Sequence, residues 1–194
     1  MSEFFKPSDK LLALSWKQPF AELMLHGKIE TRTWATNYRG WVLICASKTG
    51  YKFSQVHNIA GDAQIVRVTE TLGRNFDHFL SHYRAGVAIA VGRLVDCRPM
   101  RKEDEGRCFV QYHPDLYCHI YEGVTPIDPF PWKGTQGWKE VDIDIKNRIK
   151  QTDVRRIIAE AHRAICRRKG QGYSPTIEEM QAEVDRIEKE GGLA

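Results

Sequence analysis

Four charged side chains can meet in one cleft if the strands that carry them lie side by side. Lys17 and Lys48 follow apolar runs typical of strands, and Glu30 and Arg32 share one face of another strand because they are two residues apart. The cations Lys17, Arg32 and Lys48, together with Arg39, are suited to contact nucleic-acid phosphates. The Glu30 carboxylate can accept a hydrogen bond from the amino edge of a base. The spacing by itself favours a simpler reading, a surface ion pair of Glu30 with a neighbouring cation.

Tryptophan is abundant and places an aromatic side chain on the same strand. Trp34 shares the strand face of Glu30 and Arg32, where it can stack on an unpaired base, a contact worth about 1–3 kcal/mol. The alternative is that tryptophan fills the core of a small barrel. We expect that role for at least three of the five, which are Trp16, Trp34, Trp41, Trp132 and Trp138.

The segment 133–138 is a second candidate for ligand contact. It combines two glycines with Lys133 and Gln136. Such a loop can present backbone N–H groups to an anion, and Gln136 can hydrogen-bond a base edge. A plain turn that leads into the last strand explains the same residues equally well.

The same side chains could also carry out catalysis. The candidates are Lys17, Glu30 and His119, with Arg32 and Tyr117 as helpers, because a lysine beside a carboxylate can have its pKa tuned for proton transfer. In RNA cleavage, Glu30 or His119 would take the proton of the 2′-hydroxyl and the cations would stabilise the phosphate. Hydrolysis of an amide on a modified nucleoside would need an activated water beside the carboxylate.

The cysteines do not suggest a metal site or a disulfide framework. Cys108, His113, Cys118 and His119 have the wrong spacing for the common zinc fingers, and adjacent residues of a strand point to opposite faces. The five cysteines are irregularly spaced and no secretory signal is evident, so we expect buried thiols in a reducing, cytoplasmic setting. We expect no metal and no cofactor, since phosphate-loop, dinucleotide and zinc-protease motifs are missing from the sequence.

Short strands dominate the first 150 residues and helices dominate the rest. Period-two patterns and apolar runs predict strands at 11–16, 28–34, 41–47, 87–97, 117–121 and 138–145. Helical patterns predict a short helix after Pro19, weaker helices at 54–60 and 75–84, and two helices after residue 150, the first beginning near Thr152. Gly92 indicates a bulge, and the Pro-rich stretch 124–137 indicates a long loop. The fold class is therefore α+β: a small β-barrel with helices around it and a helical C-terminal extension.

Three segments together resemble the ASCH domain, a module of the PUA-like superfamily. They are LALSWKQPFAELMLHGKIETRTW with YRGWVLICASK, then AIAVGRLVDCRPM, then the stretch from YCHIYEGVTPI to KGTQGWKEV. The resemblance spans about residues 11–145 and implies a small closed β-barrel with a cleft at which the charged motif residues converge. It also implies binding of RNA, with catalytic activity in some branches, and it makes the cleft the favoured reading of Lys17, Glu30 and Arg32.

One position departs from the family pattern. Family members commonly carry a lysine where this chain has Gly27, and here Lys28 follows one place later. A branch that resembles amidohydrolases of acetylated cytidine uses that lysine with a threonine where this chain has Glu30. The resemblance therefore favours binding over amide hydrolysis, although Lys17 could supply an amine to the same cleft.

Composition and charge fit a nucleic-acid partner without demanding one. The chain has 194 residues, a formal charge of +4 and 42% hydrophobic residues, values unlike those of disordered, fibrous or membrane-spanning chains. Residues 1–60 contain 8 Lys and Arg against 4 Asp and Glu, so the excess lies near the predicted cleft. We expect a flexible arm at 1–10, the ASCH-like domain at 11–150 and the extension at 151–194. RNA or a modified nucleoside is the expected partner, DNA is second, and the C-terminal helices would dock on the domain or on a second chain.

Overall fold

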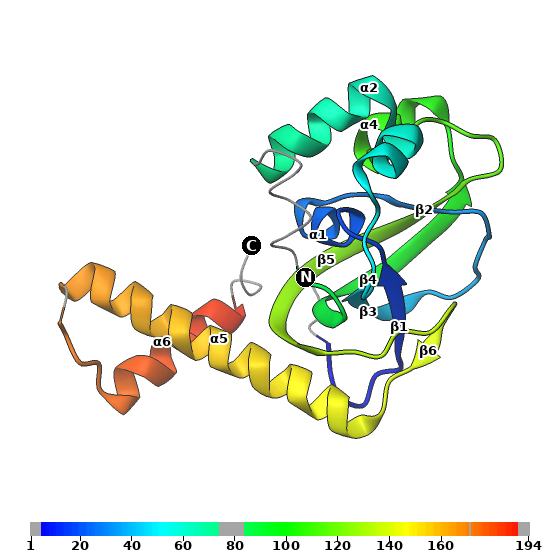
Figure 1. Ribbon diagram of the computed structural model, residues 1–194. Coiled ribbons are helices and arrows are strands. Elements are labelled where there is room, and N and C mark those ends of the chain that lie inside the picture. The colour runs from blue at the N-terminus through cyan, green and yellow to red at the C-terminus, as the bar shows by residue number, and fades with distance from the viewer. Residues whose placement is uncertain (1–4, 74–83, 171, 190–194) are drawn as a thin grey trace. The chain divides into compact units, whose positions relative to one another are not determined.

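The structure is a computed structural model that describes residues 5–73, 84–170 and 172–189 (Figure 1). It is a mixed α+β fold, as the sequence predicts. The chain forms two compact units, one of Asp9–Val141 and one of Met1–Ser8 with Asp142–Ala194. The boundary before Asp142 lies earlier than the expected one at residue 150.

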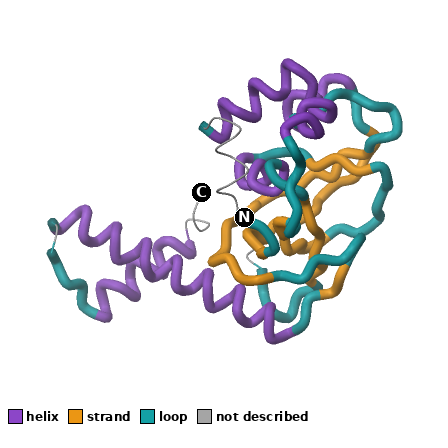
Figure 2. Tube along the Cα trace, viewed as in Figure 1, coloured by secondary structure: helices purple, strands orange, loops and turns teal. Residues whose placement is uncertain are grey.

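The larger unit is built on one six-stranded sheet that curls into a half-barrel (Figure 2). Its order is β2-β5-β4-β3-β1-β6, and only β1 and β3 are parallel. The strands are β1 (Leu11–Trp16), β2 (Glu30–Arg32), β3 (Gly40–Ala46), β4 (Val87–Pro99), β5 (Tyr117–Pro131) and β6 (Lys139–Glu140). The expected strands at 11–16, 41–47 and 87–97 are confirmed.

The helices of this unit gather at one end of the sheet (Figure 1). The expected short helix appears as α1 (Phe20–Leu23), continues as the 3-10 turn η1 (Met24–His26) and ends at Gly27, whose φ of 78° is left-handed. Helix α2 (Phe53–Leu72) lies beside α4 (Glu105–Cys108), which follows the 3-10 turn η2 (Lys102–Asp104). The helix expected at 75–84 falls almost entirely outside the described residues.

Two clusters of buried apolar side chains pack against the sheet. The first lies under α1 and α2 and includes Phe20, Leu23, Val56 and Cys118. The second includes Trp16, Val42, Ile44, Ala90 and Leu94, with Trp34 and Trp138 packed against it. Burial of each large apolar side chain contributes about 1.5–3 kcal/mol, so these clusters fix the strands that carry the charged residues.

The long strand β5 corrects the prediction of a loop at 124–137. The strand continues to Pro131, and its pairing with β4 shifts register three times. One shift lies between Val91 and Arg93, which confirms the bulge expected at Gly92. Proline is tolerated in this part of β5 because β2 pairs only with residues 117–119, so one edge of the strand needs no further N–H donors.

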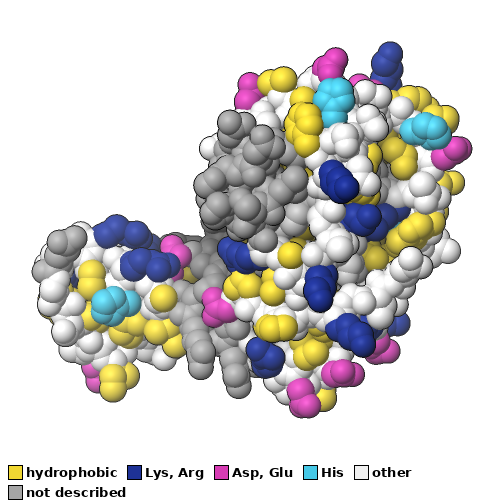
Figure 3. Space-filling model, viewed as in Figure 1, with side chains coloured by type: hydrophobic (Ala, Val, Ile, Leu, Met, Phe, Trp, Pro, Cys, Tyr) yellow, Lys and Arg dark blue, Asp and Glu magenta, His cyan; other side chains and the backbone are white. Residues whose placement is uncertain are grey.

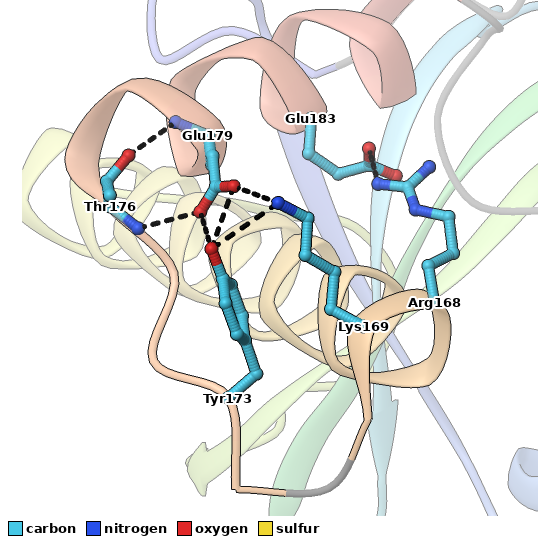
Figure 4. Close-up of polar contacts among 6 residues, drawn as sticks. All are labelled: Arg168, Lys169, Tyr173, Thr176, Glu179 and Glu183. Carbon is cyan, nitrogen blue, oxygen red and sulfur yellow. Dashed lines mark hydrogen bonds and ion pairs between the residues drawn. The ribbon is translucent and has the colours of Figure 1, made fainter.

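The smaller unit is a pair of antiparallel helices held by ion pairs (Figure 4). The strand expected at 138–145 is confirmed only at β6 (Lys139–Glu140), and helix α5 (Ile143–Lys169) begins earlier than the start expected near Thr152. Asp142 takes an extended N-cap conformation without a side-chain cap hydrogen bond, and Asp144 lies in the first helical turn. Helix α6 (Ile177–Lys189) returns along it. Glu179 accepts hydrogen bonds from Lys169 and Tyr173. Among the described helices, none is long and apolar enough to cross a membrane.

Candidate functional site

A cleft of about 920 Å³ opens in the larger unit between the ends of β1 and β2. Its other walls are formed by residues 110–113, by part of α2 and by residues 135–137. Figure 3 shows Lys and Arg side chains spread over one face of this unit, with Asp and Glu mostly at its margins. Of the residues predicted from the sequence, the cleft brings together Lys17, Glu30, Arg32, Trp34 and Gln136.

Glu30 lies between two cations at the inner end of the cleft. Its Oε2 is 2.9 Å from Lys28 Nζ and its Oε1 is 3.0 Å from Arg32 Nε. Lys28 also donates to the Ile29 carbonyl and has a side chain only 1% exposed. Burial opposes ionisation of Glu30, but Lys28 and Arg32 outweigh it and lower the pKa of the carboxyl. The group therefore stays an anion that orients two cations.

Arg32 connects the two strands that border the cleft. Its Nη2 donates to the Ser15 carbonyl over 3.0 Å, and its guanidinium lies 5.3 Å from the centre of the Trp16 ring. These contacts fix the guanidinium by a hydrogen bond, an ion pair and a cation–π contact. The strand that ends in Trp16 is thereby joined to the strand that contains Glu30.

Lys17 forms the outer cationic part of the cleft. Its Nζ lies 4.7 Å from the centre of the Tyr51 ring. The hydroxyl residues Ser47 and Thr49 also line this region. An anionic group bound here would meet one ammonium and several hydroxyl donors.

Trp34 lines the cleft beside Glu30 and packs against the His119 ring. Their ring centres are 4.8 Å apart, and His119 Nε2 lies 3.0 Å from the Trp34 carbonyl, which makes Nε2 the protonated nitrogen. Burial lowers the pKa of His119, so the ring is held neutral. Although it pairs with Glu30 across β2 and β5, His119 is fully buried and does not line the cleft.

Several predicted site residues lie elsewhere. Arg39 pairs with Asp96 at 3.3 Å on an exposed surface. Lys48, Lys133 and Tyr117 are not among the residues that line the cleft, and Lys48 and Lys133 are exposed. Trp16 and Trp132 are buried, as expected of core tryptophans.

Lys28, the most buried cation of the site, was not among the residues predicted from the sequence. Lys28 follows Gly27, and its distance of two residues from Glu30 was the available signal, since it places both on one strand face. Tyr51, Asn58 and Gln111 also line the cleft, but α2 and the 110–113 segment reach it only through tertiary folding.

The inner end of the cleft adjoins unusual buried polar atoms. Trp16 Nε1, Tyr121 Oη and His119 Nδ1 have no hydrogen-bond partner among the described residues. Tyr121 is close enough to Glu30 and Arg32 for their charges to act on it. Of these three residues, only Trp16 is among those that line the cleft.

Among the described residues, no group of three His, Cys, Asp or Glu is placed to hold a metal ion. The Cys108 and Cys118 thiols lie 3.7 Å apart in the core, next to the Asp104 carboxylate. The chemistry of the cleft is therefore that of three cations, one carboxylate and aromatic walls. No protein-family model matches the chain, and a search of curated proteins finds no match either.

Proposed function

We propose that this protein is a nucleic-acid-binding module of the ASCH type within the PUA-like superfamily. Its cleft would hold a single-stranded segment or a modified base, with RNA preferred to DNA. The observation that carries the proposal is the convergence of Lys17 and Arg32 with aromatic side chains in one cleft. Cations that follow a backbone and rings that stack on bases are the usual means of binding single strands.

Each part of the cleft has a role in this proposal. Lys17 and Arg32 would contact phosphates, and Trp34 would stack on a base. Gln136 would contribute hydrogen bonds at the outer rim. We leave Arg39, Lys48 and Lys133 out of the binding set because they lie outside the cleft lining.

The test is the salt dependence of binding to a labelled single-stranded RNA of about 12 nucleotides and to the matching DNA. Affinity should fall as salt rises, and Lys17→Ala should reduce the slope of log affinity against log salt by about 0.7, the value for one single-strand phosphate contact. Arg39→Ala is the matched control and should leave the slope unchanged. Binding that ignores salt, or no binding to either strand, would overturn the proposal.

A hydrolytic role of the same cleft is the second candidate. The observation in its favour is the buried contact of 2.9 Å between Lys28 and an ionised Glu30, which could accept a proton from a bound water or a 2′-hydroxyl. The test is incubation with labelled RNA and with acetylated cytidine, comparing the wild type with identically purified Glu30→Gln. Turnover that this variant loses would support an enzyme, whereas binding without turnover would leave the binding module alone.

A further inference from the structure

Two strand edges border the cleft, and among the described strands each is left open where it faces the cleft. Strand β1 pairs with β3 along its whole length, but β6 covers its other edge only at Leu12 and Ala13. Strand β2 is the last strand of the sheet and pairs only with β5. Ser15 of β1 and Thr31 of β2 both line the cleft. The directions of their peptide groups therefore decide what the cleft can bind.

The peptide groups of Ser15 point away from β3. The Ser47 N–H donates to the Trp16 carbonyl over 2.8 Å, so the peptide groups of Trp16 face β3. Successive residues of a strand direct these groups to opposite edges. The Ser15 carbonyl accordingly accepts from Arg32. The Ser15 N–H faces the same edge, and none of the described residues accepts a hydrogen bond from it.

The peptide groups of Thr31 point away from β5. The Ile29 N–H donates over 2.9 Å to the carbonyl of Arg107, a residue of α4, and therefore not to β5. By alternation, Glu30 and Arg32 form the bonds to β5, and Thr31 directs its N–H and C=O outward as Ile29 does. Within the described part of the chain, neither group of Thr31 has a hydrogen-bond partner. One strand edge thus offers a donor and an acceptor in a single plane.

We propose that the main chain of Thr31, with the Ser15 N–H, reads the hydrogen-bonding edge of an unpaired base. This inference rests on the proposed function and makes it more specific. Glu30 is then a positioning residue, since both of its oxygens already hold cations. An unpaired base supplies coplanar donors and acceptors that match an open strand edge, and such an edge gains by finding partners.

The charges of the cleft favour a nucleic acid over an extended peptide as the occupant. A peptide could add to the same edges as a strand. However, it would bring no phosphates for Lys17 and Arg32, which share the cleft. A duplex is excluded because its base edges are already paired. Single-stranded RNA should therefore bind at least about tenfold more tightly than a duplex of the same sequence.

The test compares two substitutions at one position, using the single-stranded RNA probe described above. Thr31→Pro removes the outward N–H and is compatible with an edge position, so it should weaken binding about tenfold. Thr31→Ala removes the side chain but keeps the N–H, so it should weaken binding much less than Thr31→Pro. Equal binding by both variants would overturn the main-chain contact while the proposed function stands. A wild type that binds no RNA or DNA would refute both.

A measurement on the unmodified protein covers the case in which Thr31→Pro does not fold. Amide hydrogen exchange of the ¹⁵N-labelled wild type should show fast exchange at Thr31 and Ser15 in the free protein and protection of both when the RNA probe is bound. Unchanged exchange in the complex would overturn the inference. Protection by an unrelated extended peptide, but not by the RNA, would assign the edges to peptide binding instead.

Discussion

At the scale of single residues, the buried chain of Lys28, Glu30 and Arg32 is the feature on which the site depends. Glu30→Gln would leave the Lys28 ammonium buried without its counter-charge. We expect this substitution to lower the free energy of unfolding by about 3 kcal/mol, the cost of breaking a buried pair. Asp96→Asn breaks the exposed pair with Arg39 and should cost under about 1 kcal/mol. Urea unfolding of both variants measures the difference, and equal costs would contradict the structural role of Glu30.

Stability should rise with pH because of two groups at the site. His119 has a pKa below its ordinary 6.5, and Glu30 has one below its ordinary 4.5. In both cases the unfolded chain binds the proton more readily, so lowering the pH through these values favours unfolding. The loss should begin below about pH 6.5 for His119 and below about pH 4.5 for Glu30.

The His119 part of this profile can be isolated by substitution. His119→Gln should flatten the stability profile just below pH 6.5, and the exposed His113→Gln is the matched control. Urea unfolding across pH 4–8 is the measurement. A slope in the His119 variant equal to that of the wild type would assign the effect to another group.

At the scale of elements, the kink in α2 is essential to one wall of the cleft. Gly61 has φ 70° and ψ 172°, a conformation essentially restricted to glycine, and an added Cβ would lie 1.8 Å from Gln111 Nε2. Gly61→Ala should therefore destabilise the protein by about 1–3 kcal/mol and displace Gln111 from the cleft. Gly73 ends the same helix, and a Cβ added there would lie in open space. Gly73→Ala should therefore cost about 1 kcal/mol. Thermal unfolding compares the two, and a milder effect at Gly61 would refute the strained kink.

At the scale of the whole molecule, the two units divide the charge between different tasks. The basic run at the end of α5 is paired internally, because Arg168 contacts Glu183 and Lys169 contacts Glu179 (Figure 4). In the cleft, Lys28 and Arg32 share the single carboxylate of Glu30, and Lys17 lies over the Tyr51 ring. This distribution favours the larger unit as the place of the proposed nucleic-acid binding, and we expect a structural role for the helical unit.

Substitution of Glu183 tests this division. Glu183 is 5% exposed and accepts from Arg168 and Arg186, so Glu183→Ala should loosen α6 and reduce the helical signal in circular dichroism on heating. RNA affinity should remain that of the wild type. Glu178→Ala, in the exposed first turn of α6, is the control. A loss of RNA affinity in the Glu183 variant would show that the helical unit takes part in binding.

Local sequence patterns were sufficient for much of the fold. The strands at 11–16, 41–47 and 87–97, the glycine stop at Gly27 and the bulge at Gly92 follow from side-chain periodicity and glycine geometry, which act over a few residues. The shared face of Glu30 and Arg32 follows from the same two-residue period, whereas Trp34 lies beyond the end of β2.

Only the tertiary structure decided the rest. Strand β5 continues through several prolines because β2 pairs only with residues 117–119, and of the pattern at 138–145 only Lys139–Glu140 forms a strand, since α5 begins at Ile143. The cleft excludes Arg39, Lys48 and Lys133 and includes Lys28, Tyr51 and Gln111, because sheet order and the kink of α2 determine which distant segments meet. Period and spacing specify the face of a strand, whereas the partner across a cleft depends on long-range packing that no local pattern encodes.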